Sequence, residues 1–444
     1  MALTFSVVTF GCRVNQADSL AFEEALVARG GEATAPDQAD LVVINTCSVT
    51  ASADQGARQT ARRIARTNPG VRLVFTGCYA SRREDEVAAL PNVVRVLRNV
   101  DKDRLGPVLD ETLGALGLTT AERFGDGDGS CGARLEPGAA GRTAFTLRVQ
   151  TGCAQPCSYC IIPVTRGTPR SVPIADLLRQ IERAADAGYR EIALTGVHLG
   201  SYGRDLPKPA TLYQLLDAIA GARVPGVRFR VSSLEPMDCH PEIVDLIADG
   251  GCFAAHLHLP LQHASDRVLA AMRRPYSRRQ YEGLVARVRE RLPHASIGSD
   301  VIAGFPGETE DDFGELVDYL ERSPLSHVHV FPYSDRPGTP AAALDGKVPG
   351  LAVRARAHRL RDISAALTRR FRDQQRGTTH RALAIEDGTV VVTGNYLKVR
   401  IAPGRRRNDW VDVTVTGVSA DGIVGEVIAD ETGAERGAER VRAR

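Results

Sequence analysis

Three closely spaced cysteines are the residues of this sequence best suited to chemistry. Cys153, Cys157 and Cys160 form a C-x3-C-x2-C set. A 4Fe–4S cluster is normally held by four thiolates, so a set of three leaves one iron open. That iron can bind the amino and carboxylate groups of S-adenosylmethionine, and electron transfer can then cleave the sulfonium to a 5′-deoxyadenosyl radical. The set predicts a radical initiator in which the cofactor supplies the chemistry and the protein supplies position and electrostatics.

Zinc and plain structural thiols are the alternative roles for this set. Structural zinc usually takes two paired ligand clusters. The sequence contains no second C-x2-C pair, and the iron–sulfur interpretation is therefore favoured.

A second set of cysteines, Cys12, Cys47 and Cys78, is dispersed along the first eighty residues. Each follows an apolar run after one or two turn residues. In an open parallel sheet the carboxyl ends of the strands lie along one edge, where ligands bind, so we expect three thiols to converge there. We interpret them as ligands of a second 4Fe–4S cluster with a free iron; zinc held by three thiolates and a water is the rival.

Alternating strands and helices must position this second set, in an N-terminal domain of residues 1–123. The expected strands are residues 5–10, 41–44, 71–75 and 93–97, with helices that include residues 20–29 and 53–67. Such alternation predicts an α/β domain with a doubly wound parallel sheet. A Gly-rich stretch, residues 124–141, follows as a linker.

A second strand–helix series fills residues 142–373 and must position the first set. The expected strands are residues 145–149, 191–194, 227–231, 256–259, 297–302 and 328–331, with helices such as residues 174–187 and 311–321. Six such units predict a (β/α) barrel or a partial one. Cys153 comes just after the first of these strands, and active sites form at the carboxyl ends of barrel strands.

The character of the chain changes after an Arg-rich amphipathic stretch that runs from Pro349 to about residue 375. Short apolar runs follow at residues 390–393, 397–401, 411–416 and 423–427, separated by turn residues. They predict a small β-barrel over residues 374–432. Residues 433–444 are polar, and we expect them to be disordered.

Composition and the length of the apolar runs restrict the cellular compartment and the class of protein. The net charge of +2 neither demands nor forbids nucleic acid, and 43% hydrophobic residues are ordinary for a globular protein. No apolar run approaches the roughly 20 residues of a membrane span, and the N-terminus lacks the features of a signal peptide. We therefore expect a cytoplasmic protein without membrane contact. Nine cysteines in that compartment indicate metal binding or catalysis.

The two cysteine sets and their flanking motifs resemble the methylthiotransferase family of radical-SAM enzymes, over nearly the whole chain. The matching segments are Thr9-Phe10-Gly11-Cys12-Arg13-Val14-Asn15-Gln16, Asn45-Thr46-Cys47, Thr76-Gly77-Cys78-Tyr79-Ala80, Cys160-Ile161-Ile162-Pro163 through Arg166-Gly167, His258-Leu259-Pro260-Leu261-Gln262, Gly304-Phe305-Pro306-Gly307-Glu308-Thr309 and His329-Val330-Phe331-Pro332-Tyr333-Ser334. The resemblance implies a radical-SAM core barrel, a C-terminal RNA-binding TRAM domain, two 4Fe–4S clusters, and two molecules of S-adenosylmethionine per turnover. One molecule gives a methyl group to sulfur at the N-terminal cluster, and the other gives the radical.

Segments after later strands look like the cofactor-binding segments of radical-SAM enzymes, and they imply that Gly196, Ser233, Glu235 and Gly304 bind S-adenosylmethionine. A glycine after a strand lets a backbone approach a ligand closely. An ordinary turn glycine has the same pattern, and Glu235 could instead cap a helix.

Three branches of the family differ in substrate: N(6)-threonylcarbamoyladenosine 37 of tRNA, isopentenyladenosine of tRNA, and an aspartate of a ribosomal protein. Segments such as Leu194-Thr195-Gly196-Val197-His198 and Gly394-Asn395-Tyr396-Leu397-Lys398 resemble the first branch. Gln262-His263 departs from it, because Gln-His is more typical of the ribosomal-protein branch. The expected function is insertion of a methylthio group at C2 of the threonylcarbamoyladenosine beside the anticodon.

The expected partners are the tRNA anticodon stem-loop and a reducing electron donor such as flavodoxin or ferredoxin, with the enzyme acting as a monomer. Arg405-Arg406-Arg407 and nearby Trp410 could provide phosphate contacts and a stacking ring, or a solvated loop and a core tryptophan. A non-catalytic RNA-binding protein with structural metal sites is the rival from another class.

The remaining cysteines and most of the histidines near strand ends are not expected to bind a cofactor. Cys131, Cys239 and Cys252 match no ligand position. His198, His256, His258 and His263 lie near strand ends, where most should pack or hydrogen-bond. Of these, His263 is the candidate for lining the substrate entrance.

Overall fold

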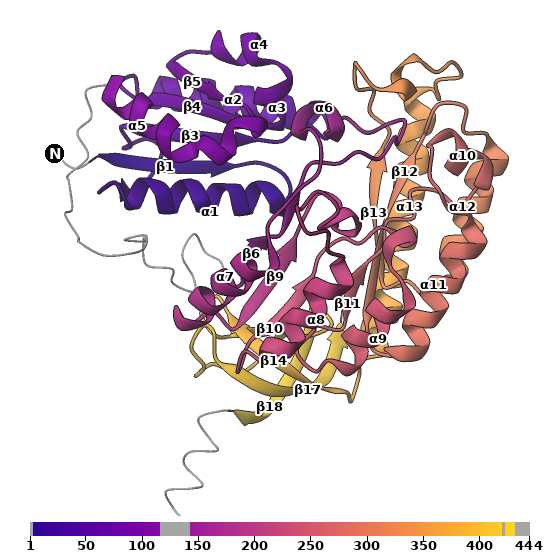
Figure 1. The fold of residues 1–444 in the computed structure, drawn as a ribbon. Coiled ribbons are helices and arrows are strands. Elements are labelled where there is room, and N and C mark those ends of the chain that lie inside the picture. Colours follow the sequence, from indigo (N-terminus) through magenta and orange to yellow (C-terminus); the bar gives the residue numbers. More distant parts are fainter. Residues whose placement is uncertain (1–2, 116–142, 420–421, 431–444) are drawn as a thin grey trace, which may run out of the picture. The chain divides into compact units, whose positions relative to one another are not determined.

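The computed structural model describes residues 3–115, 143–419 and 422–430 (Figure 1). They form two compact units. The N-terminal unit contains Met1–Leu135, Gln150–Pro156 and Cys160–Ser171, and the barrel unit contains Glu136–Val149, Cys157–Tyr159 and Val172–Arg444. The expected linker at 124–141 and the expected tail at 433–444 lie outside the described residues. Among the described helices, none is both long and apolar enough to cross a membrane.

The N-terminal unit is built on a five-stranded parallel sheet with the strand order β2-β1-β3-β4-β5. The strands are β1 (Thr4–Thr9), β2 (Glu32–Ala33), β3 (Leu41–Thr46), β4 (Arg72–Gly77) and β5 (Val93–Leu97). The helices are α1 (Arg13–Val27), α2 (Ala51–Thr67), α3 (Cys78–Arg82), α4 (Glu84–Ala88) and α5 (Leu105–Ala115).

Helices cover both faces of this sheet (Figure 1). Phe22 and Leu26 of α1 pack with Phe5 on one face, whereas Ala61 and Ile64 of α2 pack on the other. All six residues of β3 are buried, as expected for a central strand of a parallel sheet. The predicted doubly wound α/β architecture is therefore confirmed.

The barrel unit contains six parallel strands, each followed by helical structure (Figure 1). One sheet has the order β10-β9-β6 and the other β11-β12-β13. The strands are β6 (Phe145–Arg148), β9 (Glu191–Thr195), β10 (Arg228–Val231), β11 (His256–His258), β12 (Ser296–Ala303) and β13 (His327–Pro332). Isolated parallel bridges, Phe229↔Phe253 and Ser233↔His258, connect the two sheets. The result is the expected partial barrel.

Helices of the barrel unit follow the strands, and three of the described helices begin at capping boxes. They are α7 (Ile174–Asp186), α8 (Leu212–Ala222), α9 (Pro241–Asp249), α10 (Asp266–Ala271), α11 (Arg278–Arg291), α12 (Glu310–Arg322) and α13 (Gly350–Asp373). Thr211, Ser277 and Thr309 form capping boxes before α8, α11 and α12. Each box satisfies backbone N–H groups that the first turn of a helix leaves unpaired.

A closed β-barrel completes the chain, with the strand order β14-β15-β16-β18-β17. Its strands are β14 (Thr379–Ile385), β15 (Val390–Thr393), β16 (Lys398–Arg400), β17 (Trp410–Ser419) and β18 (Gly422–Asp430). The prediction of a small β-barrel is confirmed, although the sequence pattern missed β14. Only the last half of β14 is buried, so this strand lacks the apolar alternation that marks the others.

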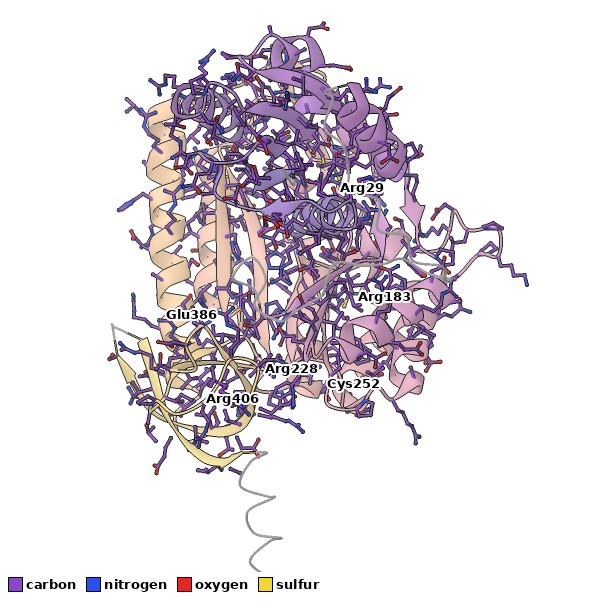
Figure 2. The ribbon with its side chains drawn as sticks, turned by 90° about the vertical axis from the view of Figure 1, so that its left-hand side faces the viewer. Arg29, Arg183, Arg228, Cys252, Glu386 and Arg406 are labelled. Carbon is purple, nitrogen blue, oxygen red and sulfur yellow. The ribbon has the colours of Figure 1, made fainter. Side chains whose placement is uncertain are left out.

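Two buried arginines of β10 join the partial barrel to the C-terminal β-barrel. Arg228 donates to the carbonyl oxygens of Arg381 at 3.1 Å and Val392 at 3.0 Å. Arg230 donates to the carbonyl oxygen of Gly394 at 3.2 Å. Figure 2 shows Arg228 beside the C-terminal β-barrel, in which Arg406 and Glu386 are labelled.

Glu191 of β9 holds both arginines in place. Its carboxylate accepts from Arg228 at 2.7 Å and from Arg230 at 3.1 Å. Burial alone would raise the pKa of Glu191, but Arg230 and Arg228 hold it at about 2. The carboxylate therefore stays ionised at neutral pH and neutralises part of the buried positive charge.

Trp410 is buried at this junction. The guanidinium groups of Arg228 and Arg381 lie 4.7 and 4.9 Å from the centre of its ring, and its Nε1 donates to the carbonyl oxygen of Gly226 at 2.9 Å. The proposal that Trp410 stacks on an RNA base is therefore wrong, and the core-tryptophan alternative is correct.

Glu191→Gln is expected to destabilise the junction by about 3 kcal/mol, because removing one partner of a buried ion pair leaves uncompensated charge. Trp410 is the only tryptophan, so its fluorescence during urea unfolding reports on this junction. The folded-state pKa of Glu191 is depressed, so its stabilisation is present above the unfolded-state pKa near 4.5 and is lost as the pH falls toward 2. The difference in the free energy of unfolding between the parent and the variant should therefore shrink as the pH falls over that range.

Asp217→Asn, at an exposed position of α8, is the matched control and should unfold like the parent. If Glu191→Gln unfolds at the parent's urea concentration at pH 7, Glu191 does not hold the junction.

Candidate functional site

The dispersed cysteines of the N-terminal unit lie at the carboxyl ends of three neighbouring strands. Cys12 follows β1 and caps α1, Cys47 follows β3 directly, and Cys78 follows β4 and begins α3. Because β1, β3 and β4 are adjacent in the sheet, the three thiols meet at one edge. Cys47 and Cys78 are buried, whereas Cys12 is exposed.

Two glycines allow the strand ends to approach this closely. Gly11 has a φ of +94°, and a Cβ there would lie 2.5 Å from the Cβ and 2.7 Å from the Sγ of Cys47. Gly77 has a φ of +95°, and a Cβ there would lie 2.2 Å from the carbonyl oxygen of Thr46. Any larger residue would be strained and would collide, so both glycines are needed to bring the cysteines together.

The environment of Cys47 opposes the ionisation of its thiol in the absence of a positive partner. Burial raises the pKa of the Cys47 thiol to about 11, and Cys78 and Cys12 act in the same direction. The N–H of Val49, 3.5 Å from the Sγ of Cys47, opposes this shift. Three converging thiolates would therefore need neighbouring positive charge.

Two buried basic residues lie beside the thiols. Lys102 donates to Asp18 at 2.6 Å, and Arg166 donates to the same carboxylate at 3.3 Å and also contacts Asn15. All four side chains are buried. Burial lowers the pKa of Lys102 and Asp18 opposes that shift, so the positive charge of this network rests on Arg166.

The thiols interact directly with this network. Burial disfavours the charged guanidinium of Arg166, but Cys78, Asp18 and Cys12 raise its pKa above the ordinary value. Three thiols at one edge beside the charged guanidinium of Arg166 fit a group bound through thiolates. The sequence motif drew attention to Cys12 and Cys78, but it gave no signal for Lys102.

The C-x3-C-x2-C segment contributes residues to both units: Cys153 and Cys160 belong to the N-terminal unit and Cys157 to the barrel unit. In the N-terminal unit, β7 (Gln150–Thr151) pairs with β8 (Arg170–Ser171), and α6 (Ile162–Arg166) lies between them. The N–H of Cys153 donates to the carbonyl oxygen of Gly167 at 3.0 Å. All three cysteines are partly exposed, and none of them forms a disulfide, so each can serve as a thiolate ligand.

In the barrel unit, a charged network surrounds Cys157. Arg274 donates to the Sγ of Cys157 at 3.1 Å, to Tyr276 at 3.1 Å, and to Glu235. Burial opposes the charge of Arg274, but Glu235 raises its pKa. Cys157 and Glu235, which the sequence predicts as a cluster ligand and a cofactor-binding residue, thus both accept from the guanidinium of Arg274.

No motif in the sequence marks Arg274 and Tyr276 as functional residues. The phenol of Tyr276 donates to the carbonyl oxygens of Pro260 at 2.9 Å and Leu261 at 3.0 Å, which anchors the network to the loop after β11. The only signal in the sequence is a pair of arginines at 273–274 after an apolar helix, and such pairs are common on protein surfaces.

The other expected cofactor-binding residues also follow strands. Gly196 comes directly after β9, Ser233 is exposed after β10, and Gly304 comes directly after β12. The N–H of Gly304 donates to Glu308 at 2.7 Å, and a Cβ at Gly304 would lie 2.4 Å from Val353. Gly304 therefore has a packing role, and its contact with a cofactor stays a prediction.

His263 does not line an entrance, contrary to expectation. Its side chain is fully buried, its Nδ1 accepts from the N–H of Ser265 at 3.0 Å, and its Nε2 lies 3.7 Å from Glu308. Burial lowers the pKa of His263 to about 4, so the ring is neutral at pH 7. The pair Gln262-His263, which differs from the tRNA-branch motif, therefore lies at buried positions.

Burial raises the pKa of Cys239 to about 12, and it also raises that of Cys252. Both thiols stay protonated at neutral pH. Cys131 lies outside the described residues.

Comparison with known proteins identifies two domains. Residues 147–320 match the radical SAM superfamily, and residues 4–98 match an uncharacterized protein family, UPF0004.

Curated relatives match most of the chain. "Threonylcarbamoyladenosine tRNA methylthiotransferase MtaB" from Aquifex aeolicus is 36% identical over 88% of this chain and 95% of its own length, and the Bacillus subtilis protein of the same name is 34% identical over 89% and 90%. A "tRNA-2-methylthio-N(6)-dimethylallyladenosine synthase" from Mycobacterium bovis is 32% identical over 95% and 80%.

A solved structure shares the fold. The radical S-adenosylmethionine methyltransferase TsrM from Kitasatospora setae has a TM-score of 0.57 and 16% identity, and the match covers 76% of this chain and 75% of TsrM. At that identity the likeness concerns the fold alone.

Proposed function

The chain belongs to the methylthiotransferase family of radical-SAM enzymes, and on this premise we propose that it inserts a methylthio group at C2 of N(6)-threonylcarbamoyladenosine 37 in tRNA. The modified adenosine lies on the 3′ side of the anticodon. Enzymes of this superfamily use S-adenosylmethionine and a 4Fe–4S cluster.

The convergence of Cys12, Cys47 and Cys78 is the observation that carries the proposal. A radical initiator alone needs one open cluster, whereas attaching a sulfur group needs a second site that can hold sulfur. Three thiols at one sheet edge, beside the buried guanidinium of Arg166 and its partners Lys102 and Asp18, suit such a site. The guanidinium of Arg166 would stabilise thiolates in that place.

Each cofactor has a proposed set of protein ligands. Cys153, Cys157 and Cys160 hold the first 4Fe–4S cluster, and Cys12, Cys47 and Cys78 hold a second. Gly196, Ser233, Glu235 and Gly304 bind S-adenosylmethionine. When bound, these groups supply electrons, a 5′-deoxyadenosyl radical and a methyl group.

The protein's own contribution is orientation and charge. Arg274 ties the carboxylate of Glu235 to the sulfur of Cys157, so a cofactor that binds Glu235 would be held near the first cluster. Because Arg274 and Tyr276 are both buried, water does not weaken this connection.

The substrate assignment rests on the relatives and on His263. The two relatives with the higher identities quoted above are named for threonylcarbamoyladenosine. The one motif that pointed to another branch contains a buried histidine, which has no direct access to a substrate. The C-terminal β-barrel would contact the anticodon stem-loop through exposed cations such as Arg406, Lys398 and Arg400.

The proposed enzyme acts as a monomer in the cytoplasm and takes electrons from a reducing donor such as flavodoxin or ferredoxin. A low-potential donor is required because the first cluster must be reduced before it can cleave a sulfonium.

Nucleosides from the tRNA of a deletion strain and its parent test this function by mass spectrometry. We expect the deletion strain to lose the methylthio form of threonylcarbamoyladenosine and to accumulate the unmodified precursor. The parental gene should restore the product, and so should Cys252→Ala, whose thiol lies outside both cysteine sets. Loss of methylthio-isopentenyladenosine instead, or unchanged tRNA with an unmodified ribosomal protein, would assign the enzyme to another branch.

A further inference from the structure

Three histidines on two strands of the barrel unit lie close to one another, and none of them belongs to either cysteine set. We propose that His258, His327 and His329 bind a divalent transition-metal ion of the zinc class, a role independent of the proposed function. His258 lies on β11, and the other two lie on β13. One ring nitrogen from each histidine lies within 4.8 Å of those from the other two, so small rotations of the rings would bring them to the spacing of metal ligands.

Strand register puts the three rings on one face. His258 pairs with Gly298 of β12, and Gly298 pairs with His327, so the three residues form one row across three strands. His329 pairs with Asp300, two residues further along β12. Side chains two residues apart on a strand share a face, so His329 and Asp300 lie beside that row.

Gly298 creates the space in which two of the nitrogens converge. A Cβ at this position would lie 2.5 Å from the Nε2 of His327 and 2.9 Å from the Nδ1 of His258. The φ of Gly298 is not in the left-handed region, so the backbone does not require glycine. What the glycine provides is room between two ligand atoms.

Asp300 orients His258 for metal binding. Its Oδ1 lies 2.9 Å from the Nε2 of His258. With a proton on Nε2, the lone pair of His258 is on Nδ1, the atom that faces Gly298 and His327. Metal-binding histidines commonly use one ring nitrogen for the ion and the other for a carboxylate.

The side chains also supply the right kind of donor atom, since each of the three residues offers an imidazole nitrogen. Imidazole nitrogen is a preferred ligand of zinc and neighbouring divalent metals.

A groove gives an ion access to this site. His327 and His329 line a cavity of about 680 Å³ together with Phe371 and Arg372 of α13 and Tyr396, Lys398 and Arg400 of the C-terminal β-barrel. Three protein nitrogens leave at least one coordination position of zinc open. The groove would allow water or an anionic oxygen to take that position.

Zinc binding to the intact holoenzyme tests the site. Protein with its iron–sulfur clusters loaded is equilibrated anaerobically with one equivalent of zinc, freed of unbound metal, and analysed by elemental analysis and zinc X-ray absorption. We expect about one zinc per chain with nitrogen and oxygen neighbours at about 2.0–2.1 Å. His327→Ala and Gly298→Ala should each lose this zinc while keeping the iron of the parent.

Matched controls separate the site from general effects. His358→Ala changes an exposed histidine of α13, and Gly314→Ala adds a Cβ where no atom lies within 4 Å; both should keep the zinc. If His327→Ala does not fold, His329→Ala at an exposed position and Gly298→Ala still decide the question.

Three results would overturn the proposal: no retained zinc, sulfur neighbours at about 2.3 Å, which indicate binding to vacant cysteines, or zinc retained in both Gly298→Ala and a histidine variant. None of these results depends on tRNA modification, so the two proposals can fail separately.

Discussion

Cys157→Ala is expected to abolish both cleavage of S-adenosylmethionine and methylthiolation of tRNA. The variant would lose one thiolate of the first cluster and also the sulfur that accepts from Arg274 at 3.1 Å. With the cluster lost, the iron content should fall from about eight to about four per chain, since each cluster holds four irons. The measurement is 5′-deoxyadenosine formed after reduction with dithionite, alongside iron and sulfide analysis.

Cys252→Ala is the control for Cys157→Ala. Its thiol is half-buried and lies in the same unit, and burial keeps its pKa above the ordinary value. Iron content and 5′-deoxyadenosine formation should match those of the parent. Continued formation of 5′-deoxyadenosine by Cys157→Ala would mean that the C-x3-C-x2-C set does not initiate the radical.

Positions with a strong local pattern could be predicted from the sequence. The strands that the sequence predicts lie within one or two residues of the observed strands at most ends, because buried parallel strands form short apolar runs between turn residues. The strands β2, β7, β8 and β14 lack such a run and were missed. Cys47 and Cys78 were correctly placed after strands for the same reason. Their convergence followed from a general property of parallel sheets and needed no knowledge of this fold.

Features that depend on distant contacts could not be predicted. Helix α1 begins at Arg13, seven residues before the expected start. The prediction missed these first turns because their buried residues Asn15, Asp18 and Ser19 are polar and form hydrogen bonds to other elements. These polar side chains hide the amphipathic pattern of the first turns. A buried position looks polar in the sequence whenever its partner is remote.

The same reasoning explains the errors at Trp410 and His263. An aromatic residue near three arginines is typical of an RNA-binding loop, but here the ring packs against Arg228 and Arg381 at an internal junction. The strand-end position of His263 suggested exposure, whereas the loop after β11 turns its ring inward. Burial at loops is set by tertiary packing and leaves no periodic signal.

Cys47→Ala is expected to stop methylthiolation while cleavage of S-adenosylmethionine continues. In the proposed mechanism Cys47 would hold the second cluster, which would supply the site for the transferred sulfur, whereas the first cluster would supply the radical chemistry. Iron should again fall to about four per chain, but 5′-deoxyadenosine should still form at a rate similar to that of the parent. The combination of lost product and kept cleavage distinguishes this variant from Cys157→Ala.

Gly11→Ala should reproduce the effect of Cys47→Ala without removing any sulfur. The added Cβ would lie 2.5 Å from the Cβ of Cys47, and the φ of +94° would strain the backbone. Gly221→Ala, where no atom lies within 4 Å of the added Cβ, should keep about eight irons and full activity. If Gly11→Ala keeps its iron and its product, close approach of Cys12 and Cys47 is unnecessary, and the second cluster must be bound elsewhere.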